Sequence, residues 1–403
     1  MQPVVISETI VQAHRVPGLA PKGRYVAVAP DLFLLPEYAV ALLAARLDAM
    51  GGPCVGSEQV LVAADHFSPP SSIERAEILA QVEAWVAKVG WEKQFRLMEG
   101  ISHQLLLEDS RLGAGKLVIG SDSHTVTAGV AGAWASGFGS LDLLYALRTG
   151  MIWLEPSAAV AVVLRGSGCP SGVMGKDVIL EVFRRLGPEG LHRKTLEFFL
   201  EDLGALPYEE RIPLCNMVVD GGATNGLFAQ EPWSEHAWRL PAYDQVLEIE
   251  LSALEPLLAL PGSPFRIAPV REHVGTRITQ AYLGSCSAGR ISDFEAFSQV
   301  VMGKKVANHV RAIAIASSQQ IYIDVVRLGY AETVLRAGVV LSNPSCGPCG
   351  GIDKGILGRN DVCIATMNRN FQGRMGSPEA QIWLANAAVV AASALAGAIA
   401  LPE

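Results

Sequence analysis

Short apolar runs alternate with longer segments of helical periodicity in the first third of the chain. The runs at residues 23–29, 59–64, 94–98 and 116–120 predict strands, whereas 38–50, 72–89 and 141–149 predict helices, with Ser71 or Ser72 capping the second of these. Such strand–helix alternation predicts an α/β fold with parallel sheets, in which ligands bind at the carboxyl ends of the strands.

The alternation continues through the rest of the chain with less regular spacing. We expect strands at 158–165, 217–220, 281–283 and 362–366, helices at 176–186 and 195–204, and a strand near 337–341. Glycine and proline punctuate the chain at 168–172 and at 260–264, the latter closing a more polar stretch, 231–264. We therefore predict three α/β domains, at residues 1–158, 159–275 and 276–403.

One segment near the end is almost free of charge and approaches the length of a membrane span. Residues 383–401 are mostly alanine, however, with Asn386 and Ser393 inside the run. Alanine contributes little to membrane insertion, so we expect a buried helix. No basic region followed by an apolar run marks the first fourteen residues, so we expect no secretory signal.

Composition adds bounds on class and compartment. Half of the 403 residues are apolar and only 18% are charged, which predicts a compact chain with a large core. The formal net charge of −8 argues against nucleic acid as a partner. Seven cysteines scattered over this length favour a reducing compartment, the cytoplasm, and thiols used for chemistry.

Histidines follow three of the predicted strands. Asp65-His66 follows 59–64, His103 comes shortly after 94–98, and Asp122-Ser123-His124 follows 116–120. A carboxylate fixes the tautomer of a neighbouring histidine and raises its basicity, which suits general acid–base catalysis. A single such pair is more often a structural hydrogen bond, but three histidines at the strand ends of one sheet favour catalysis.

Three cysteines also occupy predicted strand ends. Cys346-Gly347-Pro348-Cys349 lies in a loop after 337–341, and Cys286 follows 281–283. A Cys-x-x-Cys pair alone is typical of a metal site or of a redox dithiol. With Cys286 the set also suits an iron–sulfur cluster, and three ligands in place of four leave one iron open to substrate as a Lewis acid.

Two further loops have alternative interpretations. Asn368-Arg369-Asn370-Phe371-Gln372-Gly373-Arg374 follows 362–366 and is either a carboxylate-binding loop or a solvated turn. The glycine-rich run 129–139 matches neither a P-loop nor a dinucleotide fingerprint, so close backbone packing is the better interpretation.

With these residues in view, the chain resembles the aconitase superfamily, most of all the large subunits of 3-isopropylmalate dehydratases, which are alkylmalate isomerases. The resemblance rests on seven blocks in the family's order: 65–67, 100–109, 120–125, 216–228, 284–290, 346–351 and 368–374. It implies three α/β/α domains of the aconitase type around a central cluster, without the fourth, swivel domain. A separate small subunit would supply that domain.

The resemblance also implies an activity. Cys286, Cys346 and Cys349 would hold a [4Fe-4S] cluster with one labile, substrate-binding iron. The enzyme would be a hydro-lyase that dehydrates and rehydrates, and so isomerises, a 2- or 3-substituted malate such as 3-isopropylmalate, as in leucine biosynthesis. Its partners would be the small subunit and a small di- or tricarboxylate, with neither nucleic acid nor a membrane.

Residue roles follow from the same resemblance. Asp65 would orient His66, which handles the leaving hydroxyl, while His103 would pair with Asp122 and His124 with Asp220. The residues implied to bind substrate are Asn216, Ser123, Arg290, Asn368, Arg369 and Arg374.

Four departures from the family pattern bear on the substrate. Asp220 replaces a glutamate, Ser287-Ala288 replaces Thr-Asn after the first cluster cysteine, and Ser345 replaces a glycine. The segment 34–39 lacks the polar His-Asp-Val-Thr run of the isomerases. These departures suit a relative acting on another substituted malate. Two rivals remain: a hydratase that releases the unsaturated acid, and an iron–sulfur regulatory protein without catalysis.

Overall fold

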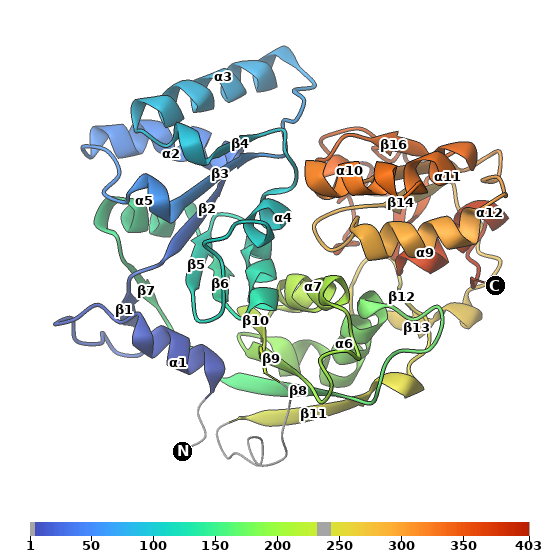
Figure 1. Cartoon of the computed structure of the whole chain (residues 1–403), viewed down its shortest axis with the longest axis horizontal. Coiled ribbons are helices and arrows are strands. Elements are labelled where there is room, and N and C mark those ends of the chain that lie inside the picture. Colours follow the sequence, from blue (N-terminus) through green and yellow to red (C-terminus); the bar gives the residue numbers. More distant parts are fainter. Residues whose placement is uncertain (1–4, 232–242, 403) are drawn as a thin grey trace. The chain divides into compact units, whose positions relative to one another are not determined.

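The computed structural model describes residues 5–231 and 243–402, and the chain within them forms two compact units (Figure 1). The first unit comprises Met1–Leu164, His192–Glu201 and Gly222–Ile249; the second comprises Arg165–Leu191, Asp202–Gly221 and Glu250–Glu403. The division into three domains at residues 158 and 275 stays a prediction. Of the polar stretch 231–264, residues 232–242 lie outside the described residues.

A five-stranded parallel sheet in the order β4-β3-β2-β5-β6 is the centre of the first unit. Its strands are β2 (Leu32–Pro36), β3 (Val60–Ala64), β4 (Phe95–Leu97), β5 (Leu117–Gly120) and β6 (Trp134–Gly137). The hydrophobic pattern predicted β3, β4 and β5 but not β2 or β6. The helices of this region are α1 (Ile6–Ala13), α2 (Glu37–Ala49), α3 (Ile73–Lys88), α4 (Ser102–Leu107) and α5 (Ser140–Thr149).

The predicted helices α2, α3 and α5 form where their apolar stripes meet the sheet. Val40 and Leu43 of α2 and Val82 of α3 are buried in one core with Phe33 and Val62 of the central strands. The side chain of Ser72 caps α3 by accepting a hydrogen bond from the backbone N–H of Arg75, at 3.3 Å, as the sequence predicted. A short antiparallel pair, β1 (Val26–Val28) with β7 (Ile152–Leu154), completes this part of the unit.

A second sheet of the first unit has the order β10-β9-β8-β11. Its strands are β8 (Ala159–Arg165), β9 (Thr195–Leu200), β10 (Asn225–Phe228) and β11 (Gln245–Glu250). The prediction of a helix at 195–204 is wrong, because Thr195–Leu200 is a strand buried along its whole length. Periodicity does not distinguish a short, fully buried strand from a helix, and the β-branched and aromatic residues of this run favour the strand.

The second unit is built on a seven-stranded mixed sheet in the order β13-β12-β18-β17-β14-β15-β16. Its strands are β12 (Leu257–Ala259), β13 (Ile267–Pro269), β14 (Gln280–Leu283), β15 (Arg311–Ile315), β16 (Val340–Ser342), β17 (Val362–Ala365) and β18 (Gln381–Leu384). Strands β14 to β18 are parallel, whereas β12 runs antiparallel to both of its neighbours.

The helices of the second unit are α6 (Gly175–Leu191), α7 (Tyr208–Met217), α9 (Ile291–Val301), α10 (Gln319–Arg327), α11 (Tyr330–Arg336) and α12 (Ala387–Ala396). The prediction of a strand at 217–220 is wrong. Met217 ends α7, and Val218–Gly221 forms a 3-10 turn, η4. The apolar run there is too short to separate a strand from the last turn of a buried helix.

The alanine-rich segment 383–401 is a strand end followed by a helix. β18 ends at Leu384, and Asn386 caps the buried helix α12 by accepting from the backbone N–H of Val389 at 2.9 Å. The predicted buried helix is therefore present but shorter than the run. Among the described residues, no helix combines the length and apolar content needed to cross a membrane.

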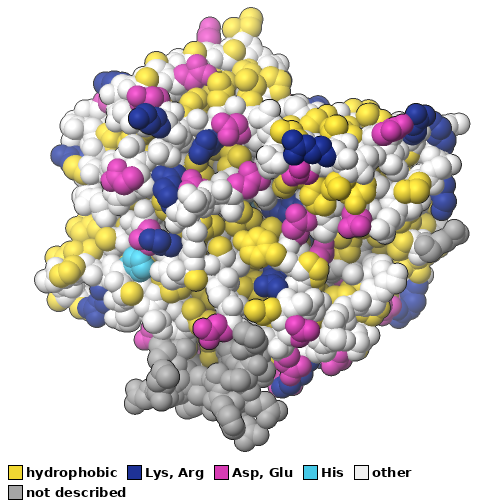
Figure 2. Space-filling view, in the orientation of Figure 1, with side chains coloured by type: hydrophobic (Ala, Val, Ile, Leu, Met, Phe, Trp, Pro, Cys, Tyr) yellow, Lys and Arg dark blue, Asp and Glu magenta, His cyan; other side chains and the backbone are white. Residues whose placement is uncertain are grey.

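On the face shown in Figure 2, acidic and basic side chains are interspersed among apolar and neutral atoms. Such mixing favours local ion pairs, for example Arg336 with Glu332 within α11 at 2.7 Å and Lys88 with Asp48 at 2.8 Å. Solvent competes with exposed pairs of this kind, so they contribute little to the stability of the fold.

Candidate active site

The parallel sheet of the first unit brings the predicted acid–base residues to one edge. Asp65 and His66 follow β3, His103 lies in the first turn of α4, and Asp122 and His124 follow β5. We call these five residues the histidine cluster. The rings of His103 and His124 have their centroids 6.1 Å apart, and Nε2 of His103 lies 3.3 Å from Oδ1 of Asp122.

Asp65 and His66 form a short contact, with Oδ1 of Asp65 2.6 Å from Nδ1 of His66. The other oxygen of Asp65 accepts from the backbone N–H of Ser102 at 2.7 Å. Burial favours the neutral carboxyl group, but the charge of His66 and these donors outweigh burial and lower the pKa of Asp65 to about 2. An ionised Asp65 holds a proton on Nδ1 of His66 and raises the basicity of the ring.

Asp122 joins the other two histidines. Its Oδ1 accepts from the backbone N–H of His124 at 2.7 Å and lies 3.4 Å from Nδ1 of the same residue. Burial again opposes ionisation, yet contacts with His103 and His124 hold the pKa of Asp122 well below its usual range. Ser123, a predicted substrate-binding residue, begins the 3-10 helix η3 (Ser123–Ala131) between Asp122 and His124.

Two residues of this edge were missed by the sequence analysis. Glu37, fully buried, accepts from the backbone N–H groups of Asp65, His66 and Phe67 at 3.2, 2.7 and 2.6 Å. It thereby fixes the turn that presents His66. Tyr38 follows it and contacts both His66 and Asp122. The signal was a carboxylate directly after the apolar run 32–36, the same pattern that revealed Asp65.

The second unit brings together the three predicted thiols, which we call the thiol cluster. Cys286 follows β14, and Cys346 and Cys349 flank the start of the 3-10 turn η7 (Gly347–Gly350). Oγ of Ser285 lies 3.9 Å from Sγ of Cys286 and 3.7 Å from Sγ of Cys349. Burial raises the pKa of Tyr282 well above its usual value, and the charges of all three thiols add to the rise. The hydroxyl of Tyr282 donates to the backbone oxygen of Cys346 at 3.5 Å.

The donor set of the thiol cluster fits an iron–sulfur cluster. Nδ2 of Asn368 lies 3.2 Å from Sγ of Cys286, and Nη2 of Arg374 lies 3.5 Å from Sγ of Cys349. Donors of this kind stabilise thiolate and bridging sulfur, and they surround metal–sulfur sites generally. All seven cysteines are free, so the three thiols are available as ligands.

The predicted substrate-binding residues of the second unit lie near the thiol cluster, and several of them are buried. Nδ2 of Asn368 also donates to Oδ1 of Asn216 at 3.0 Å, and both asparagines are fully buried. Arg290 is only 1% exposed, and its Nη2 donates to the backbone oxygen of Cys286 at 2.9 Å. Arg290 therefore braces the thiol loop from within, and its contact with substrate stays a prediction.

Asp220 forms an ion pair with Arg369, which lies in the loop after β17. Nε of Arg369 donates to Oδ1 of Asp220 at 2.6 Å, and the carboxylate side chain has no solvent exposure. A neutralising partner of this kind accounts for a buried aspartate. The pairing of His124 with Asp220, which the resemblance implies, stays a prediction.

Lys176 of α6 was also missed and is 3% exposed. Its Nζ donates to the backbone oxygens of Thr366 and Met367 at 2.7 and 3.1 Å and to Oγ of Ser287 at 3.0 Å. Burial lowers the pKa of Lys176 to about 8, although nearby carboxylates oppose the change. This lysine gives no sequence signal, because the three oxygen atoms that it contacts lie more than a hundred residues away along the chain.

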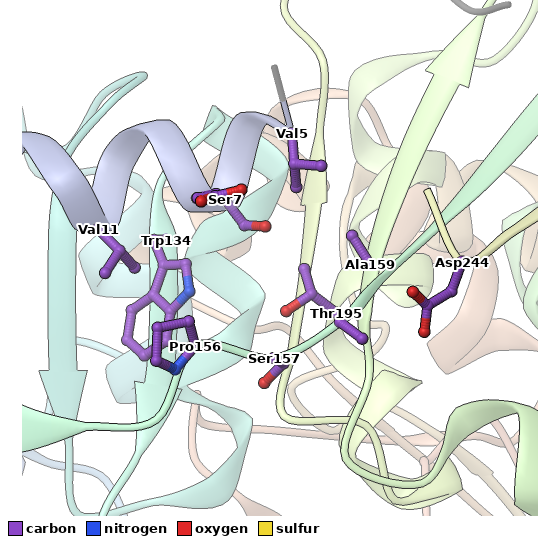
Figure 3. Close-up of a pocket in the computed structure, with 11 residues that line it drawn as sticks. Val5, Ser7, Val11, Trp134, Pro156, Ser157, Ala159, Thr195 and Asp244 are labelled. Carbon is purple, nitrogen blue, oxygen red and sulfur yellow. The ribbon is translucent and has the colours of Figure 1, made fainter. Parts of the chain in front are cut away.

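A separate cavity of the first unit, with a volume of about 230 Å³, lies beside α1 (Figure 3). Val11, Trp134 and Pro156 give it an apolar side, and the hydroxyl groups of Ser157 and Thr195 lie nearby. Its described lining contains no member of the histidine cluster. The acid–base residues of the predicted reaction therefore lie elsewhere than in this cavity.

Comparison with known proteins shows the family to which the chain belongs. The model of the aconitase family (aconitate hydratase) matches residues 8–232 and 229–397. The chain belongs to the aconitase family. It is therefore an enzyme of the hydro-lyase class, with the α/β fold and parallel sheets of that family, as the sequence predicted.

Two relatives align with the chain over nearly their whole length. The chain is 35% identical to a 3-isopropylmalate dehydratase large subunit of Clostridium botulinum (strain Eklund 17B / Type B), covering 99% of both chains. It is 35% identical to a homoaconitase large subunit of Thermus thermophilus, covering 98% of this chain and 96% of that one. Aconitase X of Thermococcus kodakaraensis, 14% identical with a TM-score of 0.56 over 88% of each chain, shares the fold.

Proposed function

We propose that the protein is the large subunit of an iron–sulfur hydro-lyase that isomerises a 2- or 3-substituted malate, 3-isopropylmalate being the reference substrate. The observation that carries this proposal is that Cys286 and Cys349 share Ser285 and Asn368 as neighbours in the second unit, with Cys346 in the same loop as Cys349. The relatives named 3-isopropylmalate dehydratase and homoaconitase support the same reaction type. A role in leucine biosynthesis is part of the proposal.

In this proposal the three cysteines hold a [4Fe-4S] cluster. When bound, the cluster supplies a Lewis-acidic iron for a carboxylate and the hydroxyl of the substrate. Asn368, which contacts the sulfurs of Cys286 and Cys349, keeps the ligand loops in register. Arg369 and Arg374 supply guanidinium groups suited to substrate carboxylates, since their planar donors match a carboxylate in pairs.

The histidine cluster supplies the proton transfers. His66, held by ionised Asp65, gives a proton to the departing hydroxyl, which leaves as water. A base takes the proton from the neighbouring carbon, so the carbon–oxygen and carbon–hydrogen bonds break and an alkene forms. Water then adds to the other carbon by the reverse transfers. His103 and His124, both set by Asp122, are proposed to complete the acid–base set.

The proposal includes a partner and a compartment. Both relatives described above are named large subunits, which supports a separate small subunit that completes the enzyme. We place the enzyme in the cytoplasm, because free thiols and a cluster with an open iron persist in a reducing compartment.

The test is product analysis of the complex reconstituted anaerobically with iron, sulfide and a small subunit from a 3-isopropylmalate dehydratase. We expect both the unsaturated acid and the isomeric alcohol to form from a 3-substituted malate. His66→Asn should reduce kcat by at least about a hundredfold through loss of the acid. His14→Asn is the matched control, since His14 contacts Asp31 at 2.7 Å in another part of the first unit.

The outcomes separate the alternatives. Unsaturated acid without the isomeric alcohol would indicate a simple hydratase. Conversion of homoaconitate in preference to alkylmalates would support the activity named for the Thermus relative. A full iron complement with no conversion of any substrate would contradict the proposal and favour a regulatory iron–sulfur protein.

A further inference from the structure

The order of strands in the first sheet determines which residue lies between the two Asp–His pairs. β2 lies between β3, which carries Asp65 and His66 at its carboxyl end, and β5, which carries Asp122. The residues that follow β2 are therefore placed between those pairs. They are Glu37, which is buried beneath the turn after β3, and Tyr38, in the first turn of α2.

Tyr38 contacts both pairs. Its ring packs edge-on against the imidazole of His66, with centroids 4.9 Å apart and planes at 85°. Its hydroxyl donates to Oδ2 of Asp122 at 3.3 Å, a long hydrogen bond of the kind that tightens when a substrate closes the site. The histidines contact the other oxygen, Oδ1, of the same carboxylate.

The phenol acts here as a hydrogen-bond donor. Burial raises the pKa of Tyr38, and the negative charge of Asp122 raises it further, so the hydroxyl stays protonated throughout the neutral range. A protonated phenol can hold one oxygen of Asp122 while the other oxygen faces His103. The bond stabilises the charged carboxylate and fixes its orientation toward the neighbouring imidazole.

Exposure shows which side chains an incoming molecule meets. In the histidine cluster the side chains of His66 and Asp122 are 18% and 21% exposed, whereas Asp65 is fully buried and His103 is 3% exposed. Tyr38 is likewise partly exposed. A substrate that reaches His66 from solvent within this unit therefore meets the ring of Tyr38 beside it.

We propose that Tyr38 is both a positioning residue and a specificity-determining residue of the reaction. Its hydroxyl orients Asp122 and thereby His103, while its ring fixes His66 and fills space next to the reacting carbons. The ring therefore limits the size of the group that a substrate can carry at C3. None of the four residues His-Asp-Val-Thr, which the resembling isomerases carry in this segment, fills space as a phenol ring does.

The inference rests on the proposed function, and two variants separate its parts. Tyr38→Val removes the ring and the hydroxyl; Tyr38→Phe removes only the hydroxyl. Tyr145→Phe is the matched control, because Tyr145 is an exposed residue of α5. Each variant is reconstituted with cluster and small subunit, and kcat and KM are measured for malate, 3-methylmalate and 3-isopropylmalate across pH.

Tyr38→Val should raise the kcat/KM ratio of isopropylmalate over methylmalate by about tenfold or more, the size of effect that a few methylene groups produce in an apolar pocket. Tyr38→Phe should keep the wild-type ratio but move the acid limb of the kcat profile to higher pH. The reason is that Asp122 loses a donor that favours its charged form.

The outcomes that overturn the inference differ from those that overturn the function. Unchanged selectivity in Tyr38→Val contradicts the specificity role while the hydro-lyase assignment stands. An unchanged pH profile in Tyr38→Phe contradicts the positioning role and decides that point even if Tyr38→Val does not fold. A wild-type complex that converts none of the three acids contradicts the proposed function itself, and this inference with it.

Discussion

Asp65 carries a negative charge inside the first unit, where burial alone would keep a carboxyl group protonated. His66 and the backbone N–H of Ser102 compensate that charge and lower the pKa of Asp65 to about 2. In an unfolded chain the same group titrates near pH 4. The folded state therefore binds fewer protons than the unfolded state between these two values, and Asp65 stabilises the fold above about pH 4.

Asp65→Asn should remove this dependence on pH. We expect the variant to be less stable than wild type by about 2 kcal/mol above pH 5, and the difference to shrink as the pH falls from 4 towards 2. Urea unfolding at several pH values measures the effect. Asp142→Asn, at an exposed position of α5, should follow wild type throughout. A difference in stability that stays constant from pH 5 to pH 3 would show that Asp65 is not ionised by its partners.

At this scale the sequence revealed residues whose chemistry is local. His66 stands next to Asp65, and Asp122 two residues before His124, so strand ends and carboxylates were enough to single them out. Glu37, Tyr38 and Lys176 were missed because none of them stands beside a histidine or a cysteine in the sequence. Their partners are brought to them by the sheets, 28 to 191 residues away along the chain.

The 3-10 helix η3 lies unusually close to strand β10 within the first unit. A Cβ atom added at Gly129 would overlap the carbonyl oxygen of Gly226 and meet Cα of Leu227. Glycine is therefore needed at this position so that η3, which begins at Ser123, can sit against the second sheet. The sequence prediction of close backbone packing at 129–139 is confirmed at this residue.

Gly129→Ala should destabilise the protein by about 2–3 kcal/mol, because the backbone must move to admit one methyl group. The control is Gly113→Ala, since nothing lies within 4 Å of the Cβ that it would add. Thermal unfolding should show a lower Tm for the first variant and little change for the second. Equal Tm values for both variants would contradict the close approach of η3 and β10.

Lys176 connects α6 to the loops after β14 and β17, which carry Cys286 and Asn368. Lys176→Met keeps most of the side-chain volume but leaves the carbonyl oxygens of Thr366 and Met367 without their lysine donor. We expect a loss of about 2 kcal/mol of stability and a faster loss of iron from the reconstituted protein in air. Chelation of released iron by a colorimetric reagent measures the second effect.

The control for this variant is Lys305→Met, which removes an exposed lysine that donates to a single carbonyl oxygen, that of Arg336. It should leave iron retention unchanged. If Lys176→Met also retains iron at the wild-type rate, the lysine supports the fold alone and does not hold the thiol loops.

The amphipathic helices and the apolar strands β3 and β5 were predictable from the sequence, whereas β9 and the segment after α7 were not. α2 and α3 each have apolar residues at helical spacing, and this spacing predicted that they are helices. β9 is buried at every position, and the apolar residues after α7 are too few to show a period. In both places tertiary packing decides between helix and strand.

At the scale of the whole molecule, the acid–base residues belong to the first unit and the cluster ligands to the second. Substitutions in the two sets of residues should therefore affect iron content and activity differently. His66→Asn should retain the iron of wild type and lose activity, whereas Cys286→Ala should lose both. Loss of iron in His66→Asn would contradict the separation of roles, because the proposed cluster ligands are all in the second unit.

Cys286, Cys346 and Cys349 are proposed to hold an iron–sulfur cluster, and the iron and sulfide content after anaerobic reconstitution tests this directly. We expect about four irons and four sulfides per chain in wild type and a large loss of both in Cys286→Ala. Cys363→Ala, which removes a buried thiol of β17, should retain them. Wild-type protein without sulfide, or equal contents in the two variants, would contradict the cluster and return Cys346 and Cys349 to a zinc or redox role.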